Sequence, residues 1–184
     1  MAPKTYTWLS LWFVLSYGIS LWDAVYILLR PHSLPGGKWR LPWAVYDDLE
    51  YIDKTYDINW FYEGHPKSIE LAAKATVTLP EIGLAILYLY LAHTRRSPLA
   101  PLVGFSAAFA TLIKCILWTL EEIYCGWCTV GHNSSFNIFT LWGVPMLTYA
   151  TFSMLSMWHL GVDMADALWK YSPVEIQREE NEKS

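Results

Sequence analysis

The chain alternates between four long apolar blocks and shorter polar, turn-rich segments. The apolar blocks cover residues 6–29, 71–93, 98–120 and 136–160, and each holds at most two formally charged residues. Each reaches the roughly 20 residues that a helix needs to cross a bilayer. Tryptophan and tyrosine gather near several block ends, as in the aromatic belts of membrane proteins. The pattern predicts an all-α integral membrane protein built as a four-helix bundle.

The segments between the blocks differ in length and character. The joint at residues 94–97 is short, so the helices on either side of it are expected to be antiparallel neighbours. Residues 30–70 are turn-rich at first and then polar and aromatic, which indicates an ordered cap on one membrane face, with a short interfacial helix around residues 43–56. We expect residues 1–170 to form a single domain and the polar residues 171–184 to form a disordered tail.

Composition supports the membrane assignment and excludes some partners. The chain is 54% hydrophobic and 16% charged, whereas soluble domains carry about 25% charged residues. The formal net charge is −4, and no clustered basic surface is available for nucleic acid phosphates. The sequence contains no phosphate loop, nucleophile elbow or metal signature, so we expect no cofactor and no metal.

Ionisable residues interrupt the apolar blocks. One such group at the bilayer centre costs roughly 2.5–3.5 kcal/mol on insertion scales, so these residues normally face the interior of a bundle and mark a site. The set comprises Asp23, Lys74, Glu81, Lys114, Glu121 and Glu122.

Helical spacing predicts that several of these residues share inward faces. Lys74, Thr78 and Glu81 recur at steps of four and three, and Lys114 and Trp118 are four residues apart. A structural interpretation stays open beside the functional one. Lys114 and Asp23 could neutralise each other as a buried pair, and Arg30, Glu121 and Glu122 lie near enough to the interface to reach water.

A cavity with carboxyl groups and aromatic walls fits acid–base chemistry on carbon. A carboxylic acid in an apolar setting can protonate an alkene. The carbocation that results would be stabilised by carboxylates and aromatic rings, and a second group would remove a neighbouring proton. This chemistry moves double bonds or closes rings in a hydrophobic substrate that enters from the lipid.

Several motifs resemble one known family. WDAVYILLRPHSLPGG (residues 22–37), WAVYDDLEYIDKTYD, LPEIGLAILYLYLAH, PLAPLVGFSAAFATLIKCILWTLEEIYCG and VGHN follow one another in this order. Together they resemble the EXPERA domain, especially fungal emopamil-binding-protein-like members, over roughly residues 8–170. The resemblance implies four helices in the endoplasmic reticulum membrane. The members of that family include a sterol double-bond isomerase, the sigma-two receptor and proteins of lipid handling.

The resemblance also bears on individual residues. Asp23 falls at the place of the isomerase's acidic residue in the first helix, and Glu81 and Lys114 match a glutamate and a lysine of fungal members. Three positions depart from the isomerase pattern. Where the isomerase has a glutamate, this chain has Lys74 or Ala75. Ile19 replaces a histidine of the isomerase. After Pro145, Met146 and Tyr149 stand in place of an asparagine and a tryptophan. These departures favour a specialised isomerase or cyclase of a biosynthetic pathway.

Our first hypothesis is therefore an isomerase or cyclase of a terpenoid, sterol-like or polycyclic substrate, with Asp23 and Glu81 as acid and base. Lys74, Lys114, Glu121 and Glu122 would tune their charge. The residues expected to line the cavity are Tyr26, Trp118, Trp142, Met146 and Tyr149. The alternatives are a non-catalytic sterol- or lipid-binding protein and a structural partner in a membrane enzyme complex. The expected partners are a hydrophobic small molecule from the bilayer and membrane lipids.

Orientation is expected from the segment between the third and fourth blocks. Lysine and arginine are divided almost evenly between the two sides, so the positive-inside rule does not decide. Asn133 begins a glycosylation sequon, and Cys125 and Cys128 could form a disulfide in an oxidising compartment. Both features predict that this segment lies in the lumen of the endoplasmic reticulum and that the termini lie in the cytosol.

Overall fold

The computed structural model describes residues 4–170, so the predicted tail at residues 171–184 lies outside the described residues. Four helical segments, at 7–28, 66–95, 100–124 and 135–170, are long and apolar enough to cross a membrane. This confirms the prediction of an all-α integral membrane protein. In chain order the segments are α1 (Thr7–Leu28), α3 (Pro66–Leu89) with the π-helical turn η3 (Tyr90–Arg95), α4 (Ala100–Tyr124), and α5 (Ser135–Asn137) with η4 (Ile138–Gly143) and α6 (Val144–Lys170).

The second span, at 66–95, extends past its apolar block at both ends, and a polar side chain caps its beginning. The second span begins at Pro66, where a missing N–H costs nothing, and the backbone N–H of Lys67 donates to Nδ1 of His65 over 3.2 Å. In place of one interfacial helix at residues 43–56, the cap (residues 29–65) contains the 3₁₀ segments η1 (Leu41–Tyr51) and η2 (Lys54–Tyr56) and the short helix α2 (Ile58–Tyr62).

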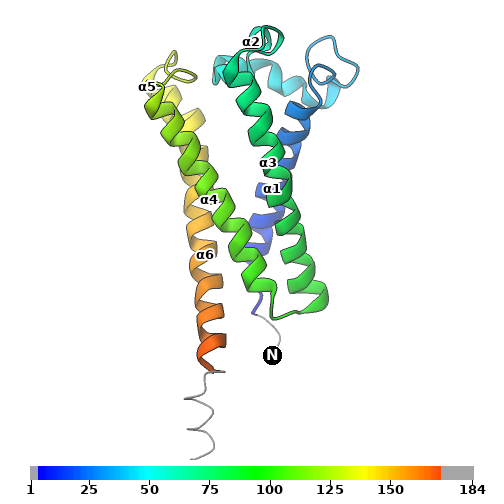
Figure 1. Ribbon diagram of the computed structural model, residues 1–184, viewed down its shortest axis with the longest axis vertical. Coiled ribbons are helices and arrows are strands. Elements are labelled where there is room, and N and C mark those ends of the chain that lie inside the picture. The colour runs from blue at the N-terminus through cyan, green and yellow to red at the C-terminus, as the bar shows by residue number, and fades with distance from the viewer. Residues whose placement is uncertain (1–3, 171–184) are drawn as a thin grey trace, which may run out of the picture.

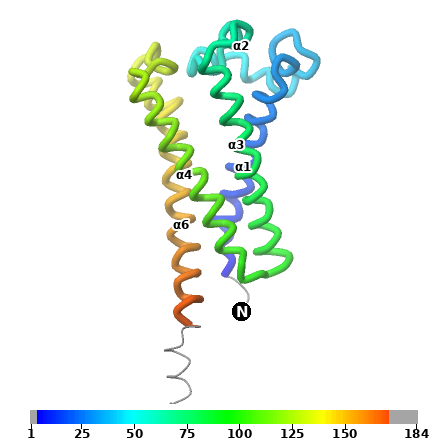
Figure 2. The backbone as a smooth tube through the Cα atoms, viewed as in Figure 1, coloured from blue at the N-terminus to red at the C-terminus, as the bar shows by residue number. Residues whose placement is uncertain are grey.

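The four spans form two arms that meet at one end. α1 packs along α3, and α4 packs along α6, while α3 and α4 join the two arms. Figure 1 and the tube in Figure 2 show the arms close together at the N-terminal end and separated toward the cap. The buried core at the closed end joins all four spans through Phe13 of α1, Tyr88 of α3, Ala107 of α4 and Leu160 of α6.

Gly104 permits the close approach of three helices at this end. A Cβ atom added there would lie 2.6 Å from Cδ2 of Tyr88 and 2.8 Å from Cδ1 of Leu160. Real Cβ contacts are not that short, so these two side chains occupy the space that any larger residue would need. The close contact fixes the point from which the arms diverge.

The core at the cap end joins one arm only. It contains Ala24 and Ile27 of α1, Leu34 and Trp43 of the cap, and Leu71 of α3. The indole N–H of Trp43 donates to the backbone oxygen of Trp22 over 3.1 Å, which fastens the cap to α1. Among the described residues this core includes none from α4 or α6, so apolar packing leaves the arms apart here.

Polar contacts bridge the arms at the cap end instead. The backbone N–H of Lys54 donates to the backbone oxygen of Thr129 over 3.1 Å, and Nδ2 of Asn133 donates to that of Ile52 over 2.9 Å. These bonds join the cap to the loop that follows α4. The candidate site lies between these bonds and the closed end of the bundle.

Candidate functional site

A cavity of about 330 Å³ lies between the two arms on the cap side of the bundle. Its walls come from α1, α3, α4, α6 and the cap, and they are mostly apolar. Ile19 and Ile27 of α1, Leu71 of α3 and Met146 of α6 contribute to them. The volume falls at the lower end of the roughly 300–1,000 Å³ range of small-molecule sites. A hydrophobic ligand of modest size, or the polar end of a larger one, fits this space.

Asp23 is the one carboxylate among the described residues that line this cavity. The hydroxyl of Tyr56 donates to Oδ1 of Asp23 over 2.9 Å, and Tyr46 lines the same cavity. Within residues 4–170, Asp23 makes no direct ion pair, although Arg30 and Lys114 attract it from a longer distance. The carboxylate is therefore oriented by the Tyr56 hydroxyl and remains available to a ligand.

The two tyrosines keep their protons at neutral pH. Burial raises the pKa of Tyr56 well above its usual value, and the negative charge of Asp23 adds to the shift. The pKa of Tyr46 is raised for the same two reasons, burial first. Both hydroxyls therefore stay donors. The sequence pattern did not identify these two tyrosines as site residues, because they lie in the cap. The aromatic segment YDDLEYIDKTY, which contains both, is the feature that could have indicated them.

Glu81 lies outside the cavity lining, behind Lys114. Its side chain is 4% exposed, and Nζ of Lys114 lies 2.8 Å from its Oε2. The hydroxyl of Thr111 donates to its other carboxylate oxygen over 2.5 Å. Lys114 also reaches the hydroxyl of Thr78 over 3.3 Å, and both of these residues line the cavity. The structure thus brings Asp23 and Lys114 to one cavity and pairs Lys114 with Glu81 rather than with Asp23.

The predicted lining residues divide between the cavity and its surroundings. Trp118, Met146 and Tyr149 line the cavity. Trp142 lines a smaller polar pocket beside it. Tyr26 is 2% exposed and packs toward the cap, with the Arg30 guanidinium carbon 5.0 Å from its ring centre.

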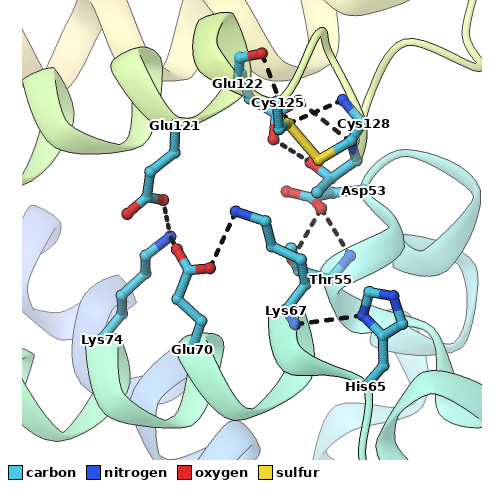
Figure 3. A network of polar contacts seen from close by, with 11 residues as sticks. Asp53, Thr55, His65, Lys67, Glu70, Lys74, Glu121, Glu122, Cys125 and Cys128 are labelled. Carbon is cyan, nitrogen blue, oxygen red and sulfur yellow. Dashed lines mark hydrogen bonds and ion pairs between the residues drawn. A yellow bond between two sulfur atoms is a disulfide. The ribbon is translucent and has the colours of Figure 1, made fainter.

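Four charged side chains form a network at the cap end, which Figure 3 shows from close by. Glu70 pairs with Lys67 over 3.0 Å and with Lys74 over 2.9 Å, all within α3. Lys74 also contacts Glu121 of α4 directly, which links the two arms. We call Lys67, Glu70, Lys74 and Glu121 the cap-side ion network. It borders the small polar pocket, while Trp118 lines both that pocket and the cavity.

The remaining predicted residues organise the loop after α4. Glu122 is buried and accepts bonds from the backbone N–H of Thr129 over 3.3 Å and from its hydroxyl over 2.6 Å. Cys125 and Cys128 form a disulfide. Nδ2 of Asn133, the atom that glycosylation would modify, donates to backbone oxygens of Ile52 and Val130. In the folded structure these residues hold the loop and do not line the cavity.

These features define an integral membrane protein with four spans and an ionisable cavity between its helices. Comparison with protein-family models, with curated proteins and with solved structures found no match to this chain.

Proposed function

We propose that the protein is a membrane-embedded isomerase or cyclase that transfers protons at a carbon–carbon double bond of a terpenoid, sterol-like or other polycyclic substrate. The observation that carries the proposal is Asp23, a carboxyl group in an apolar cavity, which accepts a bond from the Tyr56 hydroxyl and has no direct ion pair within residues 4–170. Such a group can give and take a proton at a ligand's carbon atom. The substrate would enter from the bilayer.

The reaction needs no external oxidant or reductant. The carboxylic acid form of Asp23 would add its proton to one alkene carbon, using the electron pair of the double bond to form the new C–H bond. The carbocation would then lose a proton from a neighbouring carbon to the Asp23 carboxylate, which moves the double bond. If a second double bond attacks the cation first, a ring closes before the proton leaves. Glu81 would act as a positioning residue that holds Lys114.

The sequence resemblance to the EXPERA domain supports this proposal and its location. The resemblance aligns Asp23 with an acidic residue of a sterol isomerase and implies the membrane of the endoplasmic reticulum. The disulfide between Cys125 and Cys128 lies at the same end of the molecule as the cap. Because disulfides persist in oxidising compartments, we propose that this end faces the lumen and the termini face the cytosol.

A non-catalytic sterol- or lipid-binding protein is the second candidate. It is favoured by the pairing of Glu81 with Lys114, because this pairing leaves the cavity without a second free carboxylate among the lining residues that the structure describes. A binding protein needs only the apolar walls and a few polar groups that orient the ligand.

Turnover in heavy water separates the two candidates. The purified full-length chain in lipid nanodiscs would be incubated with unsaturated sterols and terpenoid alkenes in D₂O, and the products would be analysed by mass spectrometry. We expect an isomer that carries deuterium, formed about 10²-fold more slowly by Asp23→Asn. Asp163→Asn is the control, because Asp163 accepts a bond from Tyr6 at the other end of the bundle. Saturable binding without any isomerised product, with or without deuterium, would favour the binding protein, and full activity of Asp23→Asn would refute the proposed role of Asp23.

A further inference from the structure

Lys114 presents a positive charge to the cavity while its counter-ion lies behind it. Lys114 and Thr78 belong to the lining, whereas Glu81 is buried between α3 and α4. The ion pair is neutral as a whole, but its positive end is the nearer one for any molecule inside the cavity. A ligand atom beside Lys114 therefore experiences a positive potential.

Lys114 also has hydrogen-bonding capacity to spare. An ammonium group carries three N–H donors and no acceptor. Its contacts within the described part of the chain are with Glu81 and Thr78, which use two donors. One helical turn further along α4, Trp118 lines the same cavity. Residues four apart share a helix face, so Lys114 and Trp118 form one wall of the cavity, and the third N–H of Lys114 is the spare donor on it.

The charge arrangement disfavours a carbocation near this wall and favours an oxygen that gains negative charge. Donors aimed at developing charge in a site shielded from water are the strongest form of such stabilisation. An ammonium group repels a cation, and here no second free carboxylate offsets it among the lining residues that the structure describes. The wall formed by Lys114 and Trp118 suits a carbonyl oxygen that becomes an enolate oxygen.

We propose that the substrate carries a ketone whose oxygen binds to Lys114 at the α4 wall, and that the migrating double bond lies in the β,γ position to this ketone. This inference rests on the proposed function as an isomerase, names its substrate class and replaces the carbocation intermediate by a dienolate. The apolar walls would hold the ring skeleton, and Asp23 of α1, on the same cavity, would reach the carbon between the ketone and the double bond and also the far alkene carbon.

One carboxylate is sufficient for this reaction. The Asp23 carboxylate removes a proton from the carbon between the carbonyl and the alkene. The C–H electron pair forms a new carbon–carbon double bond, and the carbonyl π pair moves to oxygen, which gives a dienolate bound by Lys114. Asp23, now a carboxylic acid, returns the proton to the far alkene carbon, and the carbonyl re-forms. The product is the conjugated enone, with no net change in oxidation state.

The test compares a β,γ-unsaturated steroid ketone with the steroid alcohol of the same ring skeleton. The full-length chain in nanodiscs would be used for equilibrium binding of both probes and for isomerisation, followed by the ultraviolet absorbance of the enone. The variant Lys114→Met/Glu81→Leu removes both charges, so that no unpaired charge is left buried. Lys67→Met is the matched control, because Lys67 pairs with Glu70 within α3 and does not line the cavity. Asp23→Asn separates binding from proton transfer.

The wild-type protein should bind the ketone more tightly than the alcohol and convert it to the conjugated enone. The double variant should bind the ketone about tenfold or more weakly, the usual scale for a bond to a charged group, and the alcohol equally well. Asp23→Asn should keep the preference for the ketone and lose isomerisation. Equal wild-type affinity for ketone and alcohol overturns the inference whether or not the variant folds, and so does an equal loss in Lys67→Met.

Failure of the inference and failure of the proposed function give different results. Equally fast isomerisation of alkenes that lack a carbonyl would overturn the ketone inference and leave the proposed isomerase intact. A ketone preference that depends on Lys114, without isomerisation of any probe, would refute the enzyme and support carbonyl recognition by a binding protein.

Discussion

Lys114 of α4 donates to the Glu81 carboxylate of α3 over 2.8 Å, and of these two residues only the lysine lines the cavity. The pair lies where the two arms separate, and Thr111 gives the same carboxylate a second donor. Because both charges lie within membrane-spanning helices, each depends on the other for its stability there. The contact has a structural role in joining α3 to α4 and also sets the charge of the cavity wall.

Removing Glu81 alone should destabilise the protein strongly. Glu81→Leu leaves the Lys114 ammonium without its counter-ion, and loss of one partner of a buried pair costs about 3–5 kcal/mol. The double variant Lys114→Met/Glu81→Leu should recover most of the lost free energy of unfolding, because no lone charge remains. The measurement is reversible unfolding in mixed micelles, followed by tryptophan fluorescence. If Glu81→Leu and the double variant were equally unstable, the loss would come from packing and not from an unpaired charge.

The buried tyrosines predict a specific loss of stability at alkaline pH. Burial, followed by the charge of Asp23, raises the pKa of Tyr46 and Tyr56 in the folded protein. An unfolded tyrosine loses its proton near pH 10, at about its ordinary pKa. The stability that depends on these neutral hydroxyls is therefore complete below about pH 10 and declines above it as the unfolded chain ionises.

The variant Tyr46→Phe/Tyr56→Phe should be less stable at neutral pH, because the bond from Tyr56 to Asp23 is lost, and should show a shallower decline above about pH 10. Unfolding free energies measured between pH 8 and about pH 12 would give both slopes. Tyr62→Phe is the control, because Tyr62 is 67% exposed. An unchanged alkaline slope in the double variant would mean that other groups cause the decline.

The sequence was sufficient to predict the four spans and the intramembrane charges, because hydropathy and block length are local properties. Asp23 was identified as a site residue for the same reason. The ion-pair partner of Lys114 could not be predicted from the sequence, because helical periodicity defines a face of one helix and not the neighbouring helix that this face meets. Glu81 therefore appeared as a second cavity carboxylate, while the structure has it behind Lys114.

The contribution of the cap could not be predicted from local pattern either. Tyr56 meets Asp23 across 33 positions of sequence, and this contact depends on how the cap turns back over α1. The path of the cap is set by long-range bonds. In one of them the Arg30 guanidinium donates to the backbone oxygen of Tyr56 over 3.3 Å. No periodic pattern encodes such a fold-back. The aromatic composition of residues 43–56 indicated order at this place but not its geometry.

Gly104 should tolerate no side chain without loss of stability. In Gly104→Ala, the new Cβ would require Tyr88 and Leu160 to move, and overpacking of this kind costs about 1–3 kcal/mol. Gly83→Ala is the matched control, because Gly83 lies on α3 and, apart from its chain neighbours and its own helix backbone, no atom of the described residues lies within 4 Å of an added Cβ. Gly83→Ala should leave the free energy of unfolding unchanged or slightly higher. Equal effects of the two substitutions would show that helix propensity, and not close packing, decides.

The proposed orientation predicts how the cysteines react in sealed microsomes. Cys125 and Cys128 form a disulfide at the cap end, and Cys115 is a buried free thiol. In a Cys115→Ser background, a membrane-permeable reductant should free Cys125 and Cys128. An impermeant maleimide should then label them only after the membrane is permeabilised. Labelling in intact microsomes would reverse the proposed orientation, and a cysteine introduced at Lys4 should show the opposite protection.

The cap-side ion network should control access to the cavity. Lys74 contacts Glu121 across the two arms, with side-chain exposures of 16% and 21%. Glu121→Lys places a second cation beside Lys74, so we expect the arms to separate at the cap end. The free energy of unfolding should fall by about 1 kcal/mol, the scale of a partly exposed pair. The exchange Lys74→Glu/Glu121→Lys restores a pair of opposite charges and should recover part of this loss, although Glu70 then faces a carboxylate.

Cys115 reports directly on this opening, because its thiol lines the cavity and is not part of the disulfide. Its labelling rate with a lipid-soluble maleimide should rise several-fold in Glu121→Lys and return toward the wild-type rate in the exchange variant. Lys67→Met, which removes a contact within α3 alone, should leave the rate unchanged. If all three variants were labelled like the wild type, the arms would be held by Gly104 and by the Glu81–Lys114 pair. The ion network would then contribute solubility at the membrane surface and no control of access.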